Sequence, residues 1–169
     1  MSSSPKDTSL PPDLSPLERQ MIDVFVDGVK VIGLPKSLGE IYGLLFLSPD
    51  ALSLDDVTQK LGLSKGSASQ GLRMLRELGA VKEASGQGGR RTLYVPDVDL
   101  KRLVGGFIRE QVRPHLESGK TKCGKLLKNA ADIDDPNLKK FYRERIHKLE
   151  GWMNRGRVVL PHIQRMLGE

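Results

Sequence analysis

Residues 53–95 have the sequence SLDDVTQKLGLSKGSASQGLRMLRELGAVKEASGQGGRRTLYV, and this stretch decides the fold of the chain. Its polar residues and glycines predict two helices separated by a tight turn. The first helix is bounded by Ser53, with Asp56 three residues later, and by Gly62; the second is bounded by Ser64 and Gly79. Apolar residues recur at helical spacing within both, so each helix has one face to bury. These faces consist of Leu54, Val57 and Leu61 in the first helix and Ala68, Leu72, Leu75 and Leu78 in the second.

Two short extended runs follow the second helix. Residues 80–84 and 90–95 have strand-like composition, and the glycine-rich segment 85–89 joins them. Helix, tight turn, helix and basic hairpin within fewer than fifty residues predict a winged helix-turn-helix. The expected fold is therefore mainly α with a small β-hairpin wing.

The second of these helices is the predicted DNA-recognition helix. Its outward face is polar, with small residues in its first turns that let the backbone approach a major groove closely. Gln70 could bond adenine through N6 and N7, and Arg73 could bond guanine through O6 and N7. The predicted DNA-contacting residues are Ser64, Lys65, Gly66, Ser67, Ser69, Gln70 and Arg73, of which Ser64, Lys65 and Ser67 suit phosphate oxygens. The alternative is an ordinary solvated face of an amphipathic helix.

The hairpin loop is the second predicted DNA contact. Gln87 and Gly88 lie in the glycine-rich tip, and Arg90 and Arg91 follow it. Glycines allow a close approach to the DNA backbone, and an arginine gains most in a narrow minor groove. A flexible surface loop with two incidental charges is the alternative.

Three runs of sequence carry a resemblance to a known family. Residues 37–45 (SLGEIYGLL), 61–69 (LGLSKGSAS) and 72–81 (LRMLRELGAV) resemble MarR-type winged-helix transcription regulators, in particular the GbsR branch. The resemblance covers about residues 15–115. It implies a dimeric repressor or activator whose winged domains bind DNA and whose flanking helices hold the dimer. Thr58 departs from the family pattern, which often has Ala there.

The predicted winged domain comprises residues 36–97, and two regions precede it. Residues 1–13 are rich in Ser, Pro and Asp and predict a disordered tail. Residues 14–35 predict an apolar helix that packs on the core or on a second subunit. Ser37 and Glu40 predict a capping box for a helix over residues 38–47.

Residues 98–169 predict a helical region for dimerisation and effector binding. We expect a kink or restart at Pro114, a last helix starting at Asp135, and an interruption at Pro161. Between them, Leu126 and Leu127 are the expected apolar anchors. The apolar stripes exceed what docking on a small winged domain needs to bury, which favours a homodimer.

Composition and charge agree with a small regulator that has an anionic partner. The chain of 169 residues is 38% hydrophobic and carries a formal charge of +6. Residues 98–169 hold 16 Lys and Arg against 9 Asp and Glu, so the excess is not concentrated on the recognition helix. No apolar run of membrane-spanning length and no apolar signal core is present, so we expect no membrane contact and a cytoplasmic protein.

Three other kinds of site can be considered from the sequence: an effector pocket, a redox-active cysteine and a metal or catalytic site. The aromatic residues Phe107, Phe141, Tyr142 and Trp152 could cage a quaternary ammonium effector, although helical spacing is more typical of core residues. Cys123, the single cysteine, excludes an intramolecular disulfide; it is a redox switch beside basic residues or, in the plainer interpretation, a surface cysteine. The residues His115, Cys123, His147 and His162 lack metal-binding spacing, and no catalytic or nucleotide-binding motif is present, so we expect no metal, no cofactor and no enzyme activity.

The sequence thus predicts a sequence-specific DNA-binding transcription regulator. It is expected to act as a homodimeric repressor that a small molecule releases or modulates. A winged-helix protein-interaction adaptor and a non-specific nucleic-acid-binding protein are the alternatives.

Overall fold

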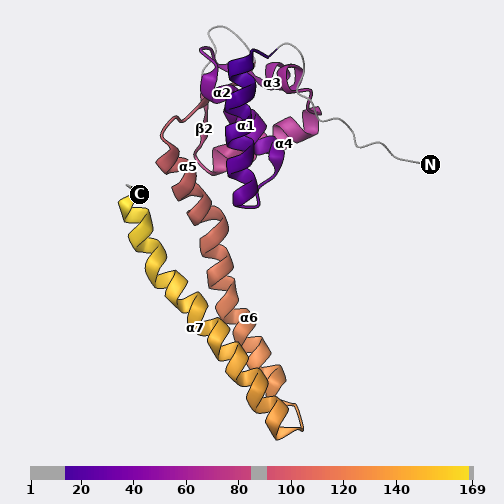
Figure 1. Cartoon of the computed structure of the whole chain (residues 1–169), viewed down its shortest axis with the longest axis vertical. Coiled ribbons are helices and arrows are strands. Elements are labelled where there is room, and N and C mark those ends of the chain that lie inside the picture. Colours follow the sequence, from indigo (N-terminus) through magenta and orange to yellow (C-terminus); the bar gives the residue numbers. More distant parts are fainter. Residues whose placement is uncertain (1–13, 85–90, 168–169) are drawn as a thin grey trace, which may run out of the picture. The chain divides into compact units, whose positions relative to one another are not determined.

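The computed structural model of the chain describes residues 14–84 and 91–167. The predicted tail, residues 1–13, and the predicted loop contacts Gln87, Gly88 and Arg90 lie outside these described residues. The chain divides into two compact units, Met1–Leu100 and Lys101–Glu169, and each is considered by itself. Figure 1 shows the chain and labels its α-helices and β2.

The first unit begins with two helices, α1 (Pro16–Val31) and α2 (Lys36–Leu47). A capping box that the sequence analysis missed starts α1: Ser15 Oγ accepts the Glu18 amide at 3.2 Å, and Glu18 Oε2 accepts the Ser15 amide at 2.7 Å. The capping box predicted for α2 is wrong. That helix begins two residues earlier than expected, which places Ser37 inside its first turn rather than at the cap.

Two glycines of α2 let it pack directly on the backbone of α1. A Cβ at Gly39 would lie 2.6 Å from Val26 Cα, and one at Gly43 would lie 2.8 Å from Ile22 Cα. Both distances are far shorter than a van der Waals contact, so larger residues would push the helices apart. The residues from Leu38 to Leu45 are all buried, which makes α2 the central helix of the unit.

The predicted helix-turn-helix is confirmed as α3 (Leu54–Leu61) and α4 (Lys65–Glu77). Gly62 ends α3 in the left-handed region at φ 66°, which favours glycine, and Ser64 caps α4 as expected. The predicted buried residues of α4 are all at most 2% exposed: Ala68, Leu72, Leu75 and Leu78.

The sheet has one more strand than the sequence predicted. The expected hairpin is confirmed as β2 (Val81–Ala84) paired antiparallel with β3 (Leu93–Pro96), with Ala84 opposite Leu93. A two-residue strand, β1 (Leu52–Ser53), pairs on the other side of β3, so the order is β1-β3-β2. A strand so short gives no period-two pattern in the sequence.

The second unit consists of long helical segments. After α5 (Leu100–Phe107), a π-helical turn, η1 (Ile108–Val112), leads into α6 (Arg113–Ala131). The restart expected at Pro114 thus takes the form of a π-helical turn. This turn ends where the Arg113 amide donates to the Ile108 carbonyl, one residue before the proline, which has no amide to donate. The helix α7 (Pro136–Met166) begins at the predicted cap, Asp135.

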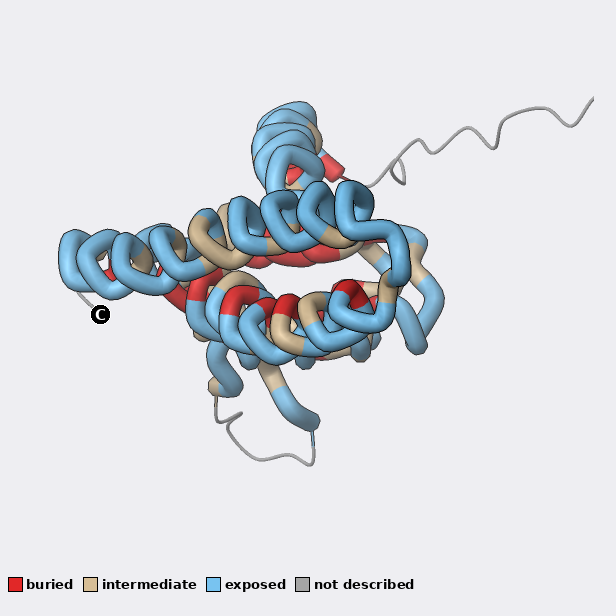
Figure 2. Tube along the Cα trace, turned by 90° about the horizontal axis from the view of Figure 1, so that it is seen from below, coloured by how far each residue is buried: buried red, intermediate tan, exposed pale blue. Residues whose placement is uncertain are grey.

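The buried residues of α6 lie mainly on the side that this helix turns toward α7 (Figure 2). Two predictions are wrong here. Leu126 is 46% exposed, while Leu116, Gly119, Cys123 and Ala130 are the buried residues of α6. Mostly small residues therefore form this face, and the side chain of Met153 occupies the space above Gly119. Pro161 does not interrupt α7, which continues through it to Met166. No helix among the described residues is long and apolar enough to cross a membrane.

Candidate nucleic-acid interface

The predicted recognition helix, α4, packs through its buried face and leaves its polar face in solvent. Gly71, which the sequence analysis did not single out, is buried where a Cβ would collide with Ile41 Cδ1 of α2. At this point α4 packs closely on the central helix. Among the predicted DNA-contacting residues, Ser69 is half-buried and the others are exposed: Ser64, Lys65, Gly66, Ser67, Gln70 and Arg73.

The first turn of α4 combines a cap with unpaired amides. Ser64 Oγ accepts the Ser67 amide at 3.1 Å and donates to Ser67 Oγ at 2.9 Å. The amides of Lys65 and Gly66 then have no acceptor within the helix, as is usual for a first turn. Positive helix-dipole potential and free N–H groups suit a phosphate oxygen at this point.

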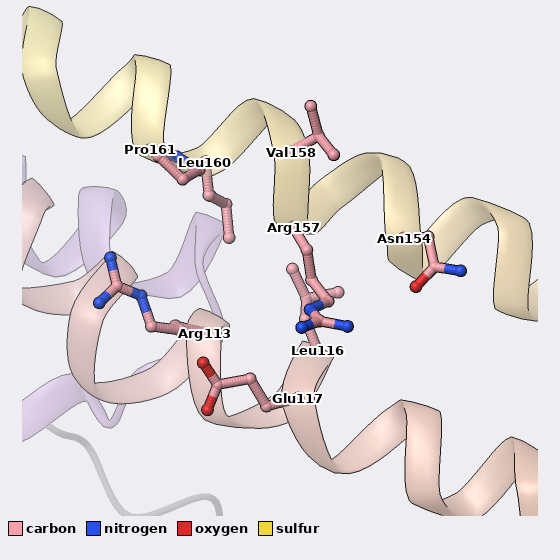
Figure 3. Close-up of a pocket in the computed structure, with 8 residues that line it drawn as sticks. All are labelled: Arg113, Leu116, Glu117, Asn154, Arg157, Val158, Leu160 and Pro161. Atoms are coloured by element: carbon pink, nitrogen blue, oxygen red, sulfur yellow. The ribbon is translucent and has the colours of Figure 1, made fainter.

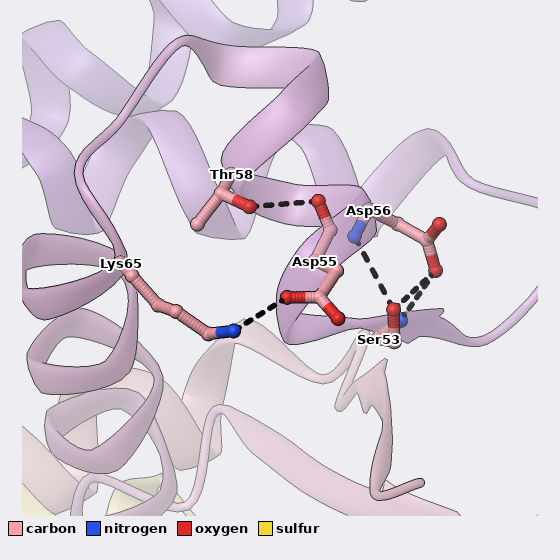
Figure 4. Close-up of polar contacts among 5 residues, drawn as sticks. All are labelled: Ser53, Asp55, Asp56, Thr58 and Lys65. Atoms are coloured by element: carbon pink, nitrogen blue, oxygen red, sulfur yellow. Dashed lines mark hydrogen bonds and ion pairs between the residues drawn. The ribbon is translucent and has the colours of Figure 1, made fainter.

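Lys65 is already engaged in an ion pair with the preceding helix. Its Nζ lies 3.0 Å from Asp55 Oδ1, and both side chains are largely exposed (Figure 4). An exposed pair of this kind contributes little stability, so a phosphate could compete for the lysine. Thr58, the departure from the family pattern, donates to the Asp55 carbonyl at 2.7 Å and thus satisfies its hydroxyl within α3.

Gln70 and Arg73 are both exposed on α4. Arg73 makes no hydrogen bond or ion pair with any residue that the structure describes, so its guanidinium is available to a ligand. Gln70 borders a small cavity of about 110 Å³ between α4 and the start of α2. Their positions three residues apart place both side chains on one helix face.

The base of the wing lies close to the start of α3. Arg91 is exposed, and its positive charge contributes to lowering the pKa of Asp56. The larger causes are the Ser53 hydroxyl at 2.6 Å and the Ser53 amide at 2.8 Å, which both donate to Asp56 Oδ2 (Figure 4). These bonds join the end of β1 to α3 beside the predicted wing contact.

A buried aspartate, missed at the sequence level, secures the end of β3. The Asp97 carbonyl accepts the Tyr42 hydroxyl at 2.5 Å, and Asp97 Oδ2 pairs with Lys82 Nζ at 2.6 Å. Burial, followed by the nearby charges of Asp97 and Asp99, raises the pKa of Tyr42 to about 12. No local pattern in the sequence indicates this role of Asp97, because its partners, Tyr42 and Lys82, are distant in the sequence.

The four residues of the proposed aromatic cage do not line one site within the chain. Phe141 and Tyr142 contact each other with ring centroids 5.9 Å apart, but Trp152, ten residues further along the helix, is 61% exposed. Phe107 is half-buried on α5. A second aromatic group, unrecognised in the sequence, comprises Phe25, Tyr42 and Phe46. Its rings lie 4.8–5.8 Å apart and fill the core against one another, which leaves no space for a cation between them.

The expectation of a surface cysteine is wrong, because Cys123 is 1% exposed in the α6–α7 interface. A redox sensor needs an accessible thiolate, so this burial argues against a switch. Across residues 14–84 and 91–167, no three His, Cys, Asp or Glu side chains are grouped so as to hold a metal ion.

A helix-turn-helix followed by a small antiparallel sheet defines a winged-helix fold. A solved transcriptional regulator shares this architecture, with a TM-score of 0.63 over 90% of this chain and 97% of its own, at 17% identity. No family model matches the sequence.

Among curated proteins, the chain is similar to three Bacillus subtilis regulators. It is 29% identical over 87 residues to the HTH-type transcriptional repressor GbsR, a match that covers 52% of this chain and about half (48%) of that repressor. The HTH-type transcriptional repressor OpcR is 18% identical over 81% of this chain and 77% of its own length. The putative HTH-type transcriptional regulator YvaV is 19% identical over 78% and 75%. These relatives confirm the predicted resemblance to GbsR-like helix-turn-helix regulators.

Proposed function

We propose that this chain is a sequence-specific DNA-binding transcription regulator. The observation that carries the proposal is the exposed polar face of α4, where Gln70 and the unpartnered Arg73 stand beyond a capped first turn. A helix of this kind enters the major groove with its first turns against the base edges. The names of the relatives, which are repressors or regulators of the helix-turn-helix type, support the same function.

The regulator acts as a homodimer and represses transcription. In α7 only Gln164 is buried, whereas a series of large apolar side chains is 39–84% exposed. These residues are Leu138, Phe141, Tyr142, Leu149, Trp152, Val158, Val159, Ile163 and Met166. Exposed apolar surface of this extent favours association. A two-fold dimer would also match the symmetry of an operator with two half-sites.

A small-molecule effector releases or modulates the repressor. The resemblance to GbsR-like regulators favoured a quaternary ammonium compound, but the candidate aromatic residues are not assembled in one chain. The chemical class of the effector is therefore better argued from the cavities of the second unit.

Selection from a randomised duplex pool tests the main proposal. We expect enrichment of a two-fold-symmetric motif with half-sites about 10 bp apart. Binding without an enriched motif would instead indicate a non-specific nucleic-acid-binding protein, and no binding at all would favour a protein-interaction adaptor. Light scattering coupled to gel filtration measures the oligomeric state, and a monomer at all concentrations would contradict the dimer.

A matched pair of arginine variants tests the contact itself. Arg73→Ala should cost about 1–3 kcal/mol on the selected site, a loss of roughly 5- to 150-fold in affinity, and should relax specificity at one base pair. Arg76→Ala is the control on the same helix, because Arg76 pairs with Glu83 at 2.6 Å instead of facing outward alone. An equal loss for Arg73→Ala on all sequences would make Arg73 a phosphate contact.

A further inference from the structure

A pocket of about 530 Å³ lies between α6 and α7 in the second unit. Figure 3 shows its lining, with Arg157 extending from α7 toward α6. The residues that line it are Arg113, Leu116, Glu117, Asn154, Arg157, Val158, Leu160 and Pro161. Its volume is in the range of pockets that bind small organic ligands, and its combination of apolar side chains with a few polar groups is typical of them.

The charged groups of this pocket are unequal in number. The lining contains two guanidinium groups, from Arg113 and Arg157, and a single carboxylate, from Glu117. Arg113 is held in place by a hydrogen bond from its Nη2 to the buried Gln164 Oε1. Neither Arg157 nor Glu117 has a hydrogen-bond or ion-pair partner in the described part of the chain. The charged side chains that line the pocket therefore sum to a net positive charge.

We propose that this pocket binds a small organic anion with a carboxylate or phosphate head and an apolar body. Arg157 provides the guanidinium that meets the head, since its donors are free and a guanidinium can bind two oxygens of one oxyanion at once. Arg113, positioned by Gln164, adds positive potential at the same pocket. Leu116, Leu160 and Pro161 supply the apolar wall for the body.

The same charges disfavour a quaternary ammonium ligand here. Two arginines would repel the cation, and the single carboxylate of Glu117 would have to offset both. None of the four candidate cage residues lines this pocket, so it also lacks the aromatic faces that bind such cations. This proposal gives the effector of the proposed regulator a chemical class. It rests on the proposed function only in expecting that the bound anion alters DNA binding.

Ligands that share an eight-carbon chain but differ in head group test the proposal without DNA. Octanoate, octyl phosphate, octyltrimethylammonium and octanol are titrated into the full chain below their micellar concentrations, and calorimetry measures binding. The single tryptophan, Trp152, lies two residues before Asn154 of the pocket and gives a second, fluorescent readout. We expect saturable binding of octanoate or octyl phosphate, and weaker or no binding of the other two.

Arg157→Gln removes the proposed head-group contact, and Arg155→Gln is the matched control, because Arg155 is exposed on α7 and does not line the pocket. Arg157→Gln should weaken binding of the anion about 10- to 100-fold while Arg155→Gln leaves it unchanged. Three results would overturn the proposal: no saturation by either anion at about 1 mM, equal binding of all four head groups, or equal losses in both variants. Binding of the selected duplex by the ligand-free wild type is measured separately. The regulator proposal and the anion-pocket proposal can therefore fail independently.

Discussion

The contact between α1 and α2 allows a substitution whose effect can be worked out from the structure. Gly39→Ala adds one methyl group at the closest point of the two helices. The added Cβ would lie 2.6 Å from Val26 Cα, 2.7 Å from Val26 N and 2.8 Å from Phe25 C, and all three are backbone atoms. No side-chain rotation relieves such contacts, so the helices must move apart and disturb a core in which α2 is buried over eight consecutive residues.

Two opposing terms set the magnitude. Overpacking a close-packed core costs typically about 1–3 kcal/mol. Replacing glycine by alanine inside a helix recovers about 1 kcal/mol of helix propensity. Because the clash is with three consecutive backbone atoms of α1, which cannot rotate away, we take the upper part of the overpacking range and expect a net destabilisation of about 1–2 kcal/mol.

Gly28→Ala is the control for this experiment. Gly28 lies in the interior of α1, and nothing lies within 4 Å of a Cβ added there. This substitution gains the propensity term without the clash and should stabilise the chain by about 0.5–1 kcal/mol. Urea unfolding followed by far-UV circular dichroism measures both variants. If Gly39→Ala is as stable as Gly28→Ala, the close backbone contact between α1 and α2 is refuted.

Two further substitutions examine the polar contacts around the sheet. Tyr42→Phe leaves the buried Asp97 carbonyl without its donor and should cost about 1–3 kcal/mol in urea unfolding. Because the folded-state pKa of Tyr42 is raised from 10.0 to about 12, the stability that this phenol contributes is present below pH 10 and is lost between pH 10 and 12. The variant should lack that alkaline loss, and an identical loss in both proteins would contradict the assignment. Asp56→Asn should flatten the acid side of the stability profile: hydrogen bonds from Ser53 lower the pKa of Asp56 below 3.8, so its contribution is present above pH 3.8 and is lost as the pH falls further. Unfolding curves from pH 6 down to 3 would show an unchanged slope if that contribution were absent.

Local signals in the sequence predicted most of the helix-turn-helix. Ser53, Gly62, Ser64 and Asp135 mark helix ends in the structure as they did in the sequence, because caps and left-handed glycines act on their immediate neighbours. The buried stripe of α4 followed from its spacing for the same reason. The outward polar face could therefore be predicted residue by residue, although its contact with DNA stays a proposal.

Features that depend on distant residues could not be predicted in this way. Cys123 and Leu126 stand three residues apart on a basic helix, and residue size alone favours the leucine as the apolar anchor. The structure buries the cysteine and exposes the leucine, because the partner helix approaches the face that carries Gly119 and Ala130. Pro161 shows the opposite case, in which a local helix breaker is tolerated within a 31-residue helix. Both outcomes depend on packing across α6 and α7.

The uneven distribution of charge leads to a quantitative expectation for DNA binding. The proposed recognition helix and wing offer four cations per protomer, Lys65, Arg73, Arg90 and Arg91, whereas residues 98–169 carry an excess of seven positive charges. If only Lys65, Arg90 and Arg91 of each protomer meet phosphates in a dimer, while Arg73 reads a base, the logarithm of affinity should fall with the logarithm of salt concentration with a slope of about −5. Competition from Asp55 for Lys65 would make the slope shallower. A markedly steeper slope would mean that basic residues of the second unit also neutralise DNA phosphates, and the excess there would then be part of the interface rather than a solvated surface.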